Sequence, residues 1–258
     1  MVDDDAGDAR SLPRRGGDRL HGRDAAPSLA EVGGGDRGDG ARVPDRRRGH
    51  ARGRGARRAR RDGADLATEV DFQLRRLGAR TPSFDTGVFA MGVNDGRDAS
   101  TRISARVLAA GDAVSFDFGG VVDGYCSDFG RTVFVGEPDA EFRRCHAIVV
   151  AAFEAGIAAA TVGATAADVD RATRAVIDEA GYGSWFRHRT GHCIGLDTHE
   201  RPFLSIDDET PLETGMAFTI EPSIFWPGTV GVRIEDLFVL EEGGCRSLNA
   251  FPRDLIAV

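Results

Sequence analysis

The chain has 258 residues, of which 41% are apolar, and a formal net charge of −8, so it can bury one core of about 200 residues beside an appendage. No apolar run approaches the roughly 18 residues of a membrane span, and the start MVDDDAGDAR lacks the basic and then apolar order of a secretion signal. We therefore expect a cytoplasmic protein with no membrane partner. No C-x-x-C motif occurs, so we expect reduced thiols at the four widely spaced cysteines Cys126, Cys145, Cys193 and Cys245.

The charge is unevenly spread, and the change marks a boundary near residue 62. Residues 1–62 hold 16 Arg against 11 acidic residues, whereas residues 63–258 hold 17 against 30. The first segment is rich in Arg and Gly and has almost no apolar periodicity, so we interpret it as disordered, and we hypothesise that it is partly an artefact of the gene model. Its acidic residues are interspersed and it has no aromatic residue for base stacking, so we expect no nucleic-acid partner.

The remaining residues, 63–258, have the pattern of one folded domain. Apolar residues at helical spacing predict a first helix that ends at Gly78, and further helices over 142–160 and 165–180. Thr165 and Asp168 stand in a capping-box arrangement at the start of the third. Runs rich in Val, Ile and Phe predict strands, and helices and hairpins in this order indicate an α+β domain with antiparallel pairing. The strand-like runs are AVSFDFGG, GYCSDFGRTVFVG, MAFTIEPSIF and VGVRIEDLFVL.

Two predicted hairpins bring carboxylates together. A turn at Val122 and Asp123 would place Asp117 opposite Asp128, and a turn at WPGT would place Glu221 opposite Glu235. Like charges directly opposed on a sheet are destabilising, and burying them among Phe and Ile residues would add several kcal/mol each without compensation. We therefore expect a positive group between the carboxylates.

Two kinds of positive group fit that position. Arg131 and Arg233 are close in sequence, so the carboxylates could belong to ordinary salt-bridged strands. The alternative includes His192, which lies in the glycine-flanked stretch TGHCIG. Four carboxylates and one imidazole suit two divalent first-row ions such as Mn, Co, Fe or Zn, and we favour this dinuclear site. Cys193, next to His192, is an alternative soft ligand, although we expect a small buried side chain there.

Four stretches resemble a known family closely. SFDFGGVVDGYCSDFGRT, HRTGHCIGLDTHE, TIEPS and GVRIEDLFVL are similar to the metal-site motifs of the pita-bread metallopeptidases, which include methionyl aminopeptidases, Xaa-Pro aminopeptidases and prolidases, with creatinase as a non-peptidase relative. The resemblance covers about residues 63 to 250. The motif PSF at Pro82 to Phe84, with His188 and Arg233, favours the Xaa-Pro branch.

The resemblance implies a role for each matching residue. Glu221 would bind metal and also move a proton to the leaving amine, and His199 and His188 would donate hydrogen bonds to developing charge. Thr132, Thr219 and Arg233 would support the ligands by hydrogen bonds from outside the metal site. The metal ligands would be Asp117, Asp128, His192, Glu221 and Glu235.

The resemblance also implies a chemistry. Two divalent ions, with Mn favoured, would activate a bridging water to cleave the peptide bond next to proline in a short peptide, and a homodimer is compatible with this reading. The family peptidases carry a further histidine upstream of the first Asp, whereas GVNDGRDASTRIS has none, and the matching position lies near Ala99, Ser100 or Thr101. Two alternatives therefore stay open: a creatinase-like hydrolase or lyase of a small polar metabolite, and a non-catalytic binding protein on the same fold.

Overall fold

The computed structural model describes residues 62–92, 103 and 107–258. The predictions for the Arg-rich segment before residue 62 and for Ala99, Ser100 and Thr101 lie outside these residues. Within them, three α-helices and a short 3-10 helix accompany twelve strands. The helices are α2 (Gly63–Arg76), α3 (Ala140–Ala159), α4 (Ala166–Glu179) and η1 (Gly183–Trp185). The strands are β1 (Gly87–Gly92), β2 (Asp112–Phe118), β3 (Val121–Val122), β4 (Tyr125–Cys126), β5 (Phe129–Phe134), β6 (Gly191–Cys193), β7 (Glu200–Leu204), β8 (Ala217–Ile220), β9 (Ser223–Trp226), β10 (Val230–Glu241), β11 (Gly244–Ser247) and β12 (Ile256–Ala257).

The three predicted helices are confirmed, and each begins at a side-chain cap. Asp62 and Asp65 form a capping box at α2, and Thr165 and Asp168 form the expected one at α4. At α3 the Asp139 side chain accepts a hydrogen bond from the backbone N–H of Phe142. These caps satisfy amide groups that would otherwise lack partners in the first helical turn. None of the helices among the described residues is long and apolar enough to cross a membrane.

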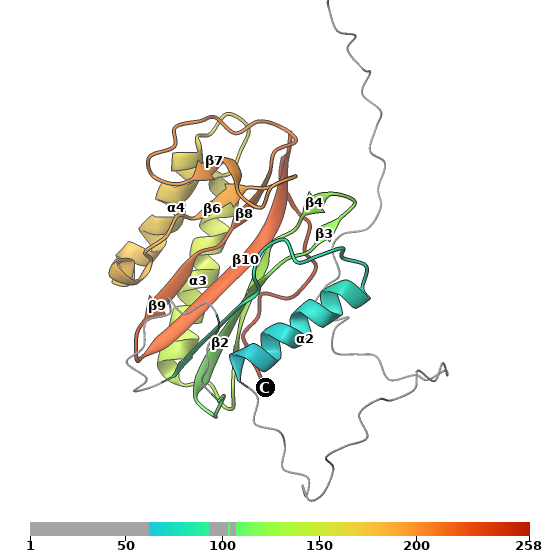
Figure 1. The fold of residues 1–258 in the computed structure, drawn as a ribbon. Coiled ribbons are helices and arrows are strands. Elements are labelled where there is room, and N and C mark those ends of the chain that lie inside the picture. The colour runs from blue at the N-terminus through green and yellow to red at the C-terminus, as the bar shows by residue number, and fades with distance from the viewer. Residues whose placement is uncertain (1–61, 93–102, 104–106) are drawn as a thin grey trace, which may run out of the picture.

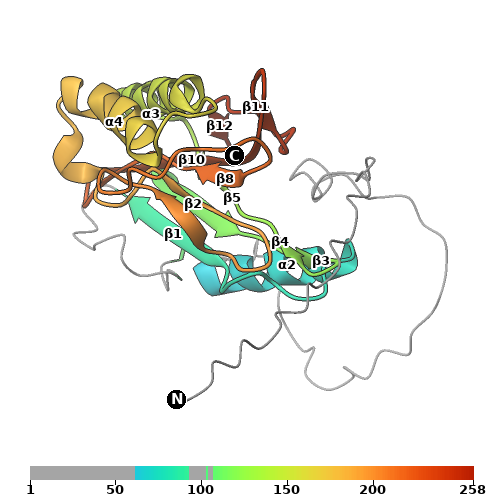
Figure 2. The ribbon, with the colours of Figure 1, turned by 90° about the horizontal axis from the view of Figure 1, so that it is seen from above.

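One ten-stranded sheet forms the middle layer of an α+β domain. Its main path runs β1-β2-β5-β10-β8-β6-β7, and β9, β11 and β12 attach to β10 and β5. Helices α3 and α4 cover one face of the sheet, and α2 lies on the other side near β2 (Figures 1 and 2). Most of the buried apolar side chains lie in one cluster that includes residues of α3, α4, β8 and β10. The long strand β10 therefore has a packed core on one face.

The first carboxylate hairpin differs from its predicted register. Asp117 pairs with Gly130 and not with Asp128, because the turn lies one residue later, at Asp123 and Gly124. Both turn residues have positive φ, 51° and 89°, which suits an Asp-Gly pair in a two-residue hairpin. Moving the turn by one residue moves each partner by two, so Asp128 stays on the same side of the sheet as the predicted register placed it. Asp117 and Asp128 are therefore still close together, although the predicted register was wrong.

The second hairpin has the predicted register. Asp236 pairs with Ile220 and Arg233 pairs with Ser223, which places Glu221 opposite Glu235. The strand opposite β10 is interrupted at Glu221 and Pro222, between β8 and β9, and Pro222 has no N–H to donate to a sheet. The amide of Glu221 instead donates to the Thr190 carbonyl oxygen at 2.8 Å. At this interruption Glu221 is therefore tied to the segment that leads into β6.

Candidate metal centre and active site

Three neighbouring strands bring the first carboxylates together. Gly130 of β5 lies between Asp117 of β2 and Glu235 of β10, because it pairs with both residues in the sheet. A Cβ atom at Gly130 would collide with the Glu235 carboxylate, so any larger residue here would have to displace that carboxylate. The missing side chain leaves room for two carboxylates over the middle strand. Asp128 lies two residues before Gly130 and is also buried.

His192 completes the cluster from β6. Its Nε2 lies 3.4 Å from Asp128 Oδ2 and 3.6 Å from Glu221 Oε1. One ligand atom from each of Asp128, His192 and Glu235 can be chosen so that all three lie within 4.8 Å of one another. All five predicted ligands line one small cavity of about 70 Å³, together with Phe84, Thr198 and His199. The structure thus brings together every residue that the sequence predicted as a ligand.

The cavity carries an excess of negative charge that burial makes costly. Burial raises the pKa of Glu221 to about 7. Burial, reinforced by the charges of Asp128 and Glu221, raises the pKa of Glu235 well above its usual range, and burial likewise raises the pKa of Asp128. For His192, burial lowers the pKa, but the hydrogen bond with Asp128 and the nearby carboxylates outweigh it, so the pKa is raised. The protein environment therefore favours added positive charge at this site.

Arg233 supplies one positive charge. Its guanidinium reaches three carboxylates, with Nη2 2.8 Å from Asp117 Oδ2, Nε 3.5 Å from Glu235 Oε2 and Nη1 3.6 Å from Glu221 Oε2. The salt-bridged alternative is therefore partly correct for Arg233. Arg131, its other candidate, turns away from the cavity and pairs with Asp236. One arginine cannot balance four carboxylates, so the cluster keeps a negative excess.

The donor set fits divalent metal ions. The oxygen atoms Asp128 Oδ1 and Glu235 Oε2 are buried and have no hydrogen-bond partner among the described residues, which is a costly state for a carboxylate. Four carboxylates and one imidazole are ligands that divalent first-row ions bind well. Bound cations would satisfy both oxygen atoms and balance the charge that Arg233 leaves. Asp117, Asp128, His192, Glu221 and Glu235 are the residues that would hold them.

Thr132 and Thr219 each form a hydrogen bond with the backbone of a residue in the cluster, and the supporting role expected for them stays a prediction. Thr132 Oγ1 accepts from the Arg233 amide at 2.8 Å, and Thr219 Oγ1 accepts from the His192 amide at 3.1 Å. Cys193 is buried in the apolar core, as expected, and burial raises the pKa of its thiol to about 12. It packs in the core and is not among the residues that line the small cavity, which fits the expectation of a small buried side chain.

Sequence reasoning missed an ion pair on α4 between a buried aspartate and a partly buried arginine. Asp170 forms a bidentate pair with Arg174, with both nitrogen-to-oxygen distances at 3.0 Å, and accepts from the Thr190 amide and hydroxyl. Arg174 also donates to the carbonyl oxygen of His188. This pair anchors the segment before His192 to the helix layer. Its only sequence signal is the i,i+4 spacing on α4, which is common on exposed helices as well.

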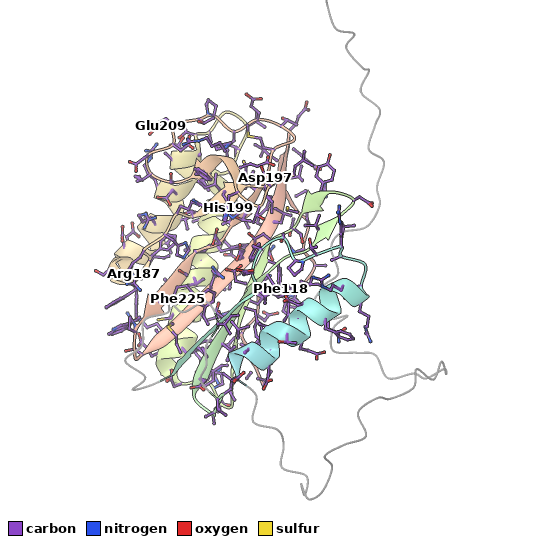
Figure 3. The ribbon with its side chains drawn as sticks, viewed as in Figure 1. Phe118, Arg187, Asp197, His199, Glu209 and Phe225 are labelled. Carbon is purple, nitrogen blue, oxygen red and sulfur yellow. The ribbon has the colours of Figure 1, made fainter. Side chains whose placement is uncertain are left out.

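The two remaining candidate histidines lie at a second, more open cavity of about 560 Å³. His199, on the segment between β6 and β7 (Figure 3), also lines the small cavity, and its ring centroid lies 4.3 Å from that of His192. His188 has protein partners at both ring nitrogens: Arg189 O at 2.8 Å and Ser223 Oγ at 2.6 Å. The hydrogen-bond donation predicted for both histidines stays a prediction. The second cavity is lined by His188, Arg189, His199, Phe203, Ser205, Glu221 and Arg233.

Comparison with known sequences decides the family. The sequence profile of metallopeptidase family M24 matches residues 48–242. The chain belongs to this family. It is 40% identical over 191 residues to an uncharacterized peptidase, YqhT, of Bacillus subtilis, covering 74% of this chain and 54% of the relative. It is 38% identical over 192 residues to the Xaa-Pro dipeptidase of Pyrococcus furiosus, covering 74% of this chain and 55% of that relative.

Solved structures confirm the pita-bread fold of this M24 chain. The X-Pro aminopeptidase of Thermotoga maritima matches it with a TM-score of 0.73 at 37% identity, over 78% of this chain and 56% of that one. The resemblance to the pita-bread metallopeptidases and to their Xaa-Pro branch is thus confirmed, as is the predicted α+β fold. The chain spans about half the length of the curated relatives it matches.

Proposed function

We propose that this M24 chain is a dinuclear-metal hydrolase that cleaves the peptide bond next to proline in short peptides. The observation that carries the proposal is the buried excess of carboxylates around Gly130, which one arginine leaves unbalanced. The relatives named as Xaa-Pro dipeptidases and aminopeptidases support the substrate class. Manganese as the metal, a cytoplasmic location and a homodimer stay predictions.

Metal ions bound by these five residues would lower the pKa of a water molecule and polarise the substrate carbonyl. The protein's own contribution begins with Glu221, which is the only one of the five proposed ligands to line both cavities. Its carboxylate can therefore take a proton at the small cavity and deliver it to a leaving amine in the larger one. His199 also lines both cavities and is placed to donate a hydrogen bond to charge that develops between them.

The larger cavity gives the substrate its space. About 560 Å³ lies within the range of roughly 300–1,000 Å³ that small-molecule sites occupy, which suits a substrate of dipeptide size. Arg233 reaches the carboxylate cluster and also lines this cavity, so it holds the ligands beside the substrate. Because the two cavities share Glu221 and His199, a peptide bound in the larger one would lie next to the proposed metal ligands, which is the requirement for attack on its carbonyl carbon.

A second candidate function rests on one feature of the sequence. The stretch GVNDGRDASTRIS contains no histidine where the family peptidases carry one, near Ala99 to Thr101. A creatinase-like hydrolase or lyase of a small polar metabolite would fit the same ligand set with different polar groups upstream. A binding protein without catalysis is the least supported alternative, because all five ligands are present.

An assay of Mn-loaded protein against Xaa-Pro dipeptides, longer Xaa-Pro peptides and small guanidino or amidino compounds separates these functions. We expect hydrolysis of Xaa-Pro dipeptides that stops on chelation and returns with Mn²⁺. Turnover of the guanidino compounds alone would favour the creatinase-like alternative. Bound metal without turnover of any substrate would contradict both enzymatic functions.

If the absent upstream histidine matters, Ala99→His or Ser100→His should raise dipeptidase activity, since one lost transition-state hydrogen bond can cost roughly 10²- to 10³-fold. Thr101→Ala, at the neighbouring position, is the matched control. A wild-type kcat/KM above roughly 10⁴ M⁻¹s⁻¹ on an Xaa-Pro substrate would overturn the importance of that histidine.

A further inference from the structure

Ser223 is a fully buried hydroxyl beside the candidate site that the proposed reaction does not use. It begins β9, two residues after Glu221, and pairs with Arg233 in the sheet. The register with β10 is the same on both sides of Glu221 and Pro222 and sets Glu221 opposite Glu235 and Ser223 opposite Arg233, so Ser223 shares the side of Glu221. Its Oγ lies 2.6 Å from Nε2 of His188, which comes from a segment 35 residues earlier.

The second contact of His188 fixes which ring nitrogen carries the proton. Nδ1 lies 2.8 Å from the Arg189 carbonyl oxygen, and a carbonyl can only accept a hydrogen bond, so Nδ1 must donate. Burial, followed by the charge of Arg233, lowers the pKa of His188 to about 4, which agrees with a neutral ring. A neutral ring with its proton on Nδ1 has an unprotonated Nε2. Nε2 therefore accepts, and the Ser223 hydroxyl donates.

Other contacts hold the His188 segment but leave the ring orientation open. Arg174 donates to the His188 backbone carbonyl at 3.0 Å, so α4 fixes the main chain. The rings of Phe186 and Phe225 lie 5.2 and 6.5 Å from the imidazole, centroid to centroid, and apolar contacts of this kind do not distinguish nitrogen from carbon in a ring. Among the described contacts, only the two hydrogen bonds of the ring distinguish its nitrogen atoms from its carbon atoms. One is to the Arg189 backbone, and the other is to the Ser223 side chain.

We propose that Ser223 is a positioning residue for His188. Its hydroxyl holds the ring in one orientation as the Nδ1–H tautomer, with Nε2 as a hydrogen-bond acceptor at the wall of the substrate cavity. This role deepens the proposed peptidase function and, for its kinetic effect, rests on it. Because Nδ1–H donates to Arg189 and the lone pair of Nε2 accepts from Ser223, His188 is an oriented part of the cavity wall and not the donor that the family resemblance implied.

Nitrogen NMR of ¹⁵N-histidine protein tests the tautomer without any activity measurement. The chain has six histidines, and the His188→Phe variant identifies the His188 resonances by their loss. We expect a protonated Nδ1 and an unprotonated, hydrogen-bonded Nε2 in the wild type. In Ser223→Ala the Nε2 resonance should shift as its donor is lost, and Ser223→Thr should restore it because the hydroxyl remains. If Ser223→Ala does not fold, Ser223→Cys keeps the size with a weaker donor.

Ser115 provides the matched control. It is a buried serine of the same sheet whose hydroxyl has no hydrogen-bond partner among the described residues, so Ser115→Ala should leave the His188 resonances unchanged. On an Xaa-Pro dipeptide, Ser223→Ala should lower kcat about tenfold with KM little changed, the scale of one hydrogen bond. Ser223→Thr should recover most of that loss.

Two results would overturn the proposal: a wild-type His188 protonated at Nε2, or His188 resonances and kcat that are the same in Ser223→Ala as in the wild type. A wild-type protein that carries metal but cleaves no Xaa-Pro substrate would refute the proposed function instead. In that case the resonances still decide whether Ser223 orients His188.

Discussion

Two buried charge clusters lie back to back on β10, and they are built in opposite ways. Glu235 faces the carboxylate cavity, whereas Asp236, the next residue, faces the other side of the strand and pairs with Arg131 and Arg253. Alternation along one strand thus separates a cluster with excess negative charge from one with excess positive charge. Both Glu235 and Asp236 are almost fully buried, so burial alone does not distinguish them.

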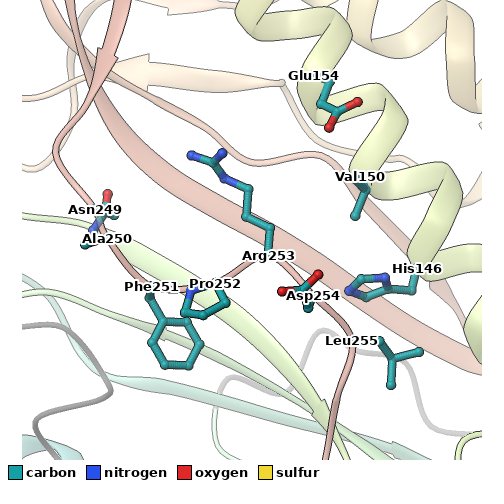
Figure 4. A pocket seen from close by; sticks show the side chains of 10 residues that line it. All are labelled: His146, Val150, Glu154, Asn249, Ala250, Phe251, Pro252, Arg253, Asp254 and Leu255. Atoms are coloured by element: carbon teal, nitrogen blue, oxygen red, sulfur yellow. The ribbon is translucent and has the colours of Figure 1, made fainter.

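Hydrogen bonding distinguishes the two clusters. Around Asp236, Arg131 Nη2 donates at 2.6 Å and Arg253 Nε at 2.7 Å, and Arg131 also donates to the Glu235 and Gly130 carbonyl oxygens. Figure 4 shows Arg253 on the C-terminal segment that faces α3. Around Glu235, by contrast, Oε2 has no hydrogen-bond partner among the described residues. A cluster that is satisfied within the protein serves the fold, whereas one left unbalanced fits cations from outside.

Removing Asp236 should have the largest effect of all. Asp236→Ala leaves the buried Arg131 without its carboxylate, so the free energy of unfolding should fall by about 3–5 kcal/mol. Urea denaturation measures the loss, which should be the same with and without Mn²⁺. A loss below about 1 kcal/mol would show that the cluster does not support the fold.

Glu221→Gln should reduce the rate and not the fold. The amide keeps the shape of the side chain but cannot move a proton, so kcat on an Xaa-Pro dipeptide should fall roughly 100-fold or more while some metal remains bound. Steady-state kinetics with metal analysis of the same sample measures both quantities. Near-normal turnover would exclude Glu221 as the proton carrier.

Glu235→Gln should have opposite effects in the absence and presence of metal. Without metal, the substitution removes a buried carboxylate from a cluster with excess negative charge. The variant should therefore be more stable than the wild type, with a free energy of unfolding higher by about 1–3 kcal/mol. With Mn²⁺, the variant should release at least one ion and lose much of the metal-induced rise in Tm. Thermal unfolding with and without EDTA tests both expectations, the higher stability without metal and the smaller rise in Tm with metal. Unchanged metal content would contradict the assignment of Glu235 as a ligand.

Arg253→Gln should have the smallest effect. Arg253 is partly exposed, and Arg131 would still pair with Asp236, so we expect a loss of about 1 kcal/mol or less in the free energy of unfolding. Metal content should not change. A loss as large as that of Asp236→Ala would mean that Arg253, and not Arg131, is the main partner.

The sequence predicted the parts of this arrangement that depend on local pattern. Helical spacing identified α2, α3 and α4, and the WPGT turn gave the register that places Glu221 opposite Glu235. The predicted turn of the first hairpin was wrong by one residue. Asp123 adopts a left-handed conformation, which composition alone does not reveal. The alternation of side chains kept Asp128 on the correct face despite that error.

The sequence could not predict the contacts that depend on packing between distant segments. Strand β6 has only three residues, too few for a periodic pattern, and its role is to carry His192 beside β8. Either Arg131 or Arg233 could have entered the carboxylate cluster, and only the assembled sheet decides for Arg233. The partners of His188 likewise lie on different elements, so no spacing in the sequence indicates them.

Metal stoichiometry tests the central claim most directly. We expect titration of metal-free protein with Mn²⁺, followed by elemental analysis after gel filtration, to give two ions per chain in the wild type and at most one in Glu235→Gln. Asp236→Asn is the matched control on the same strand. The folded protein recovered from gel filtration should bind as many Mn²⁺ ions per chain as the wild type does. A wild-type chain that retains no divalent ion, or a Glu235→Gln chain that still binds two, would contradict the account.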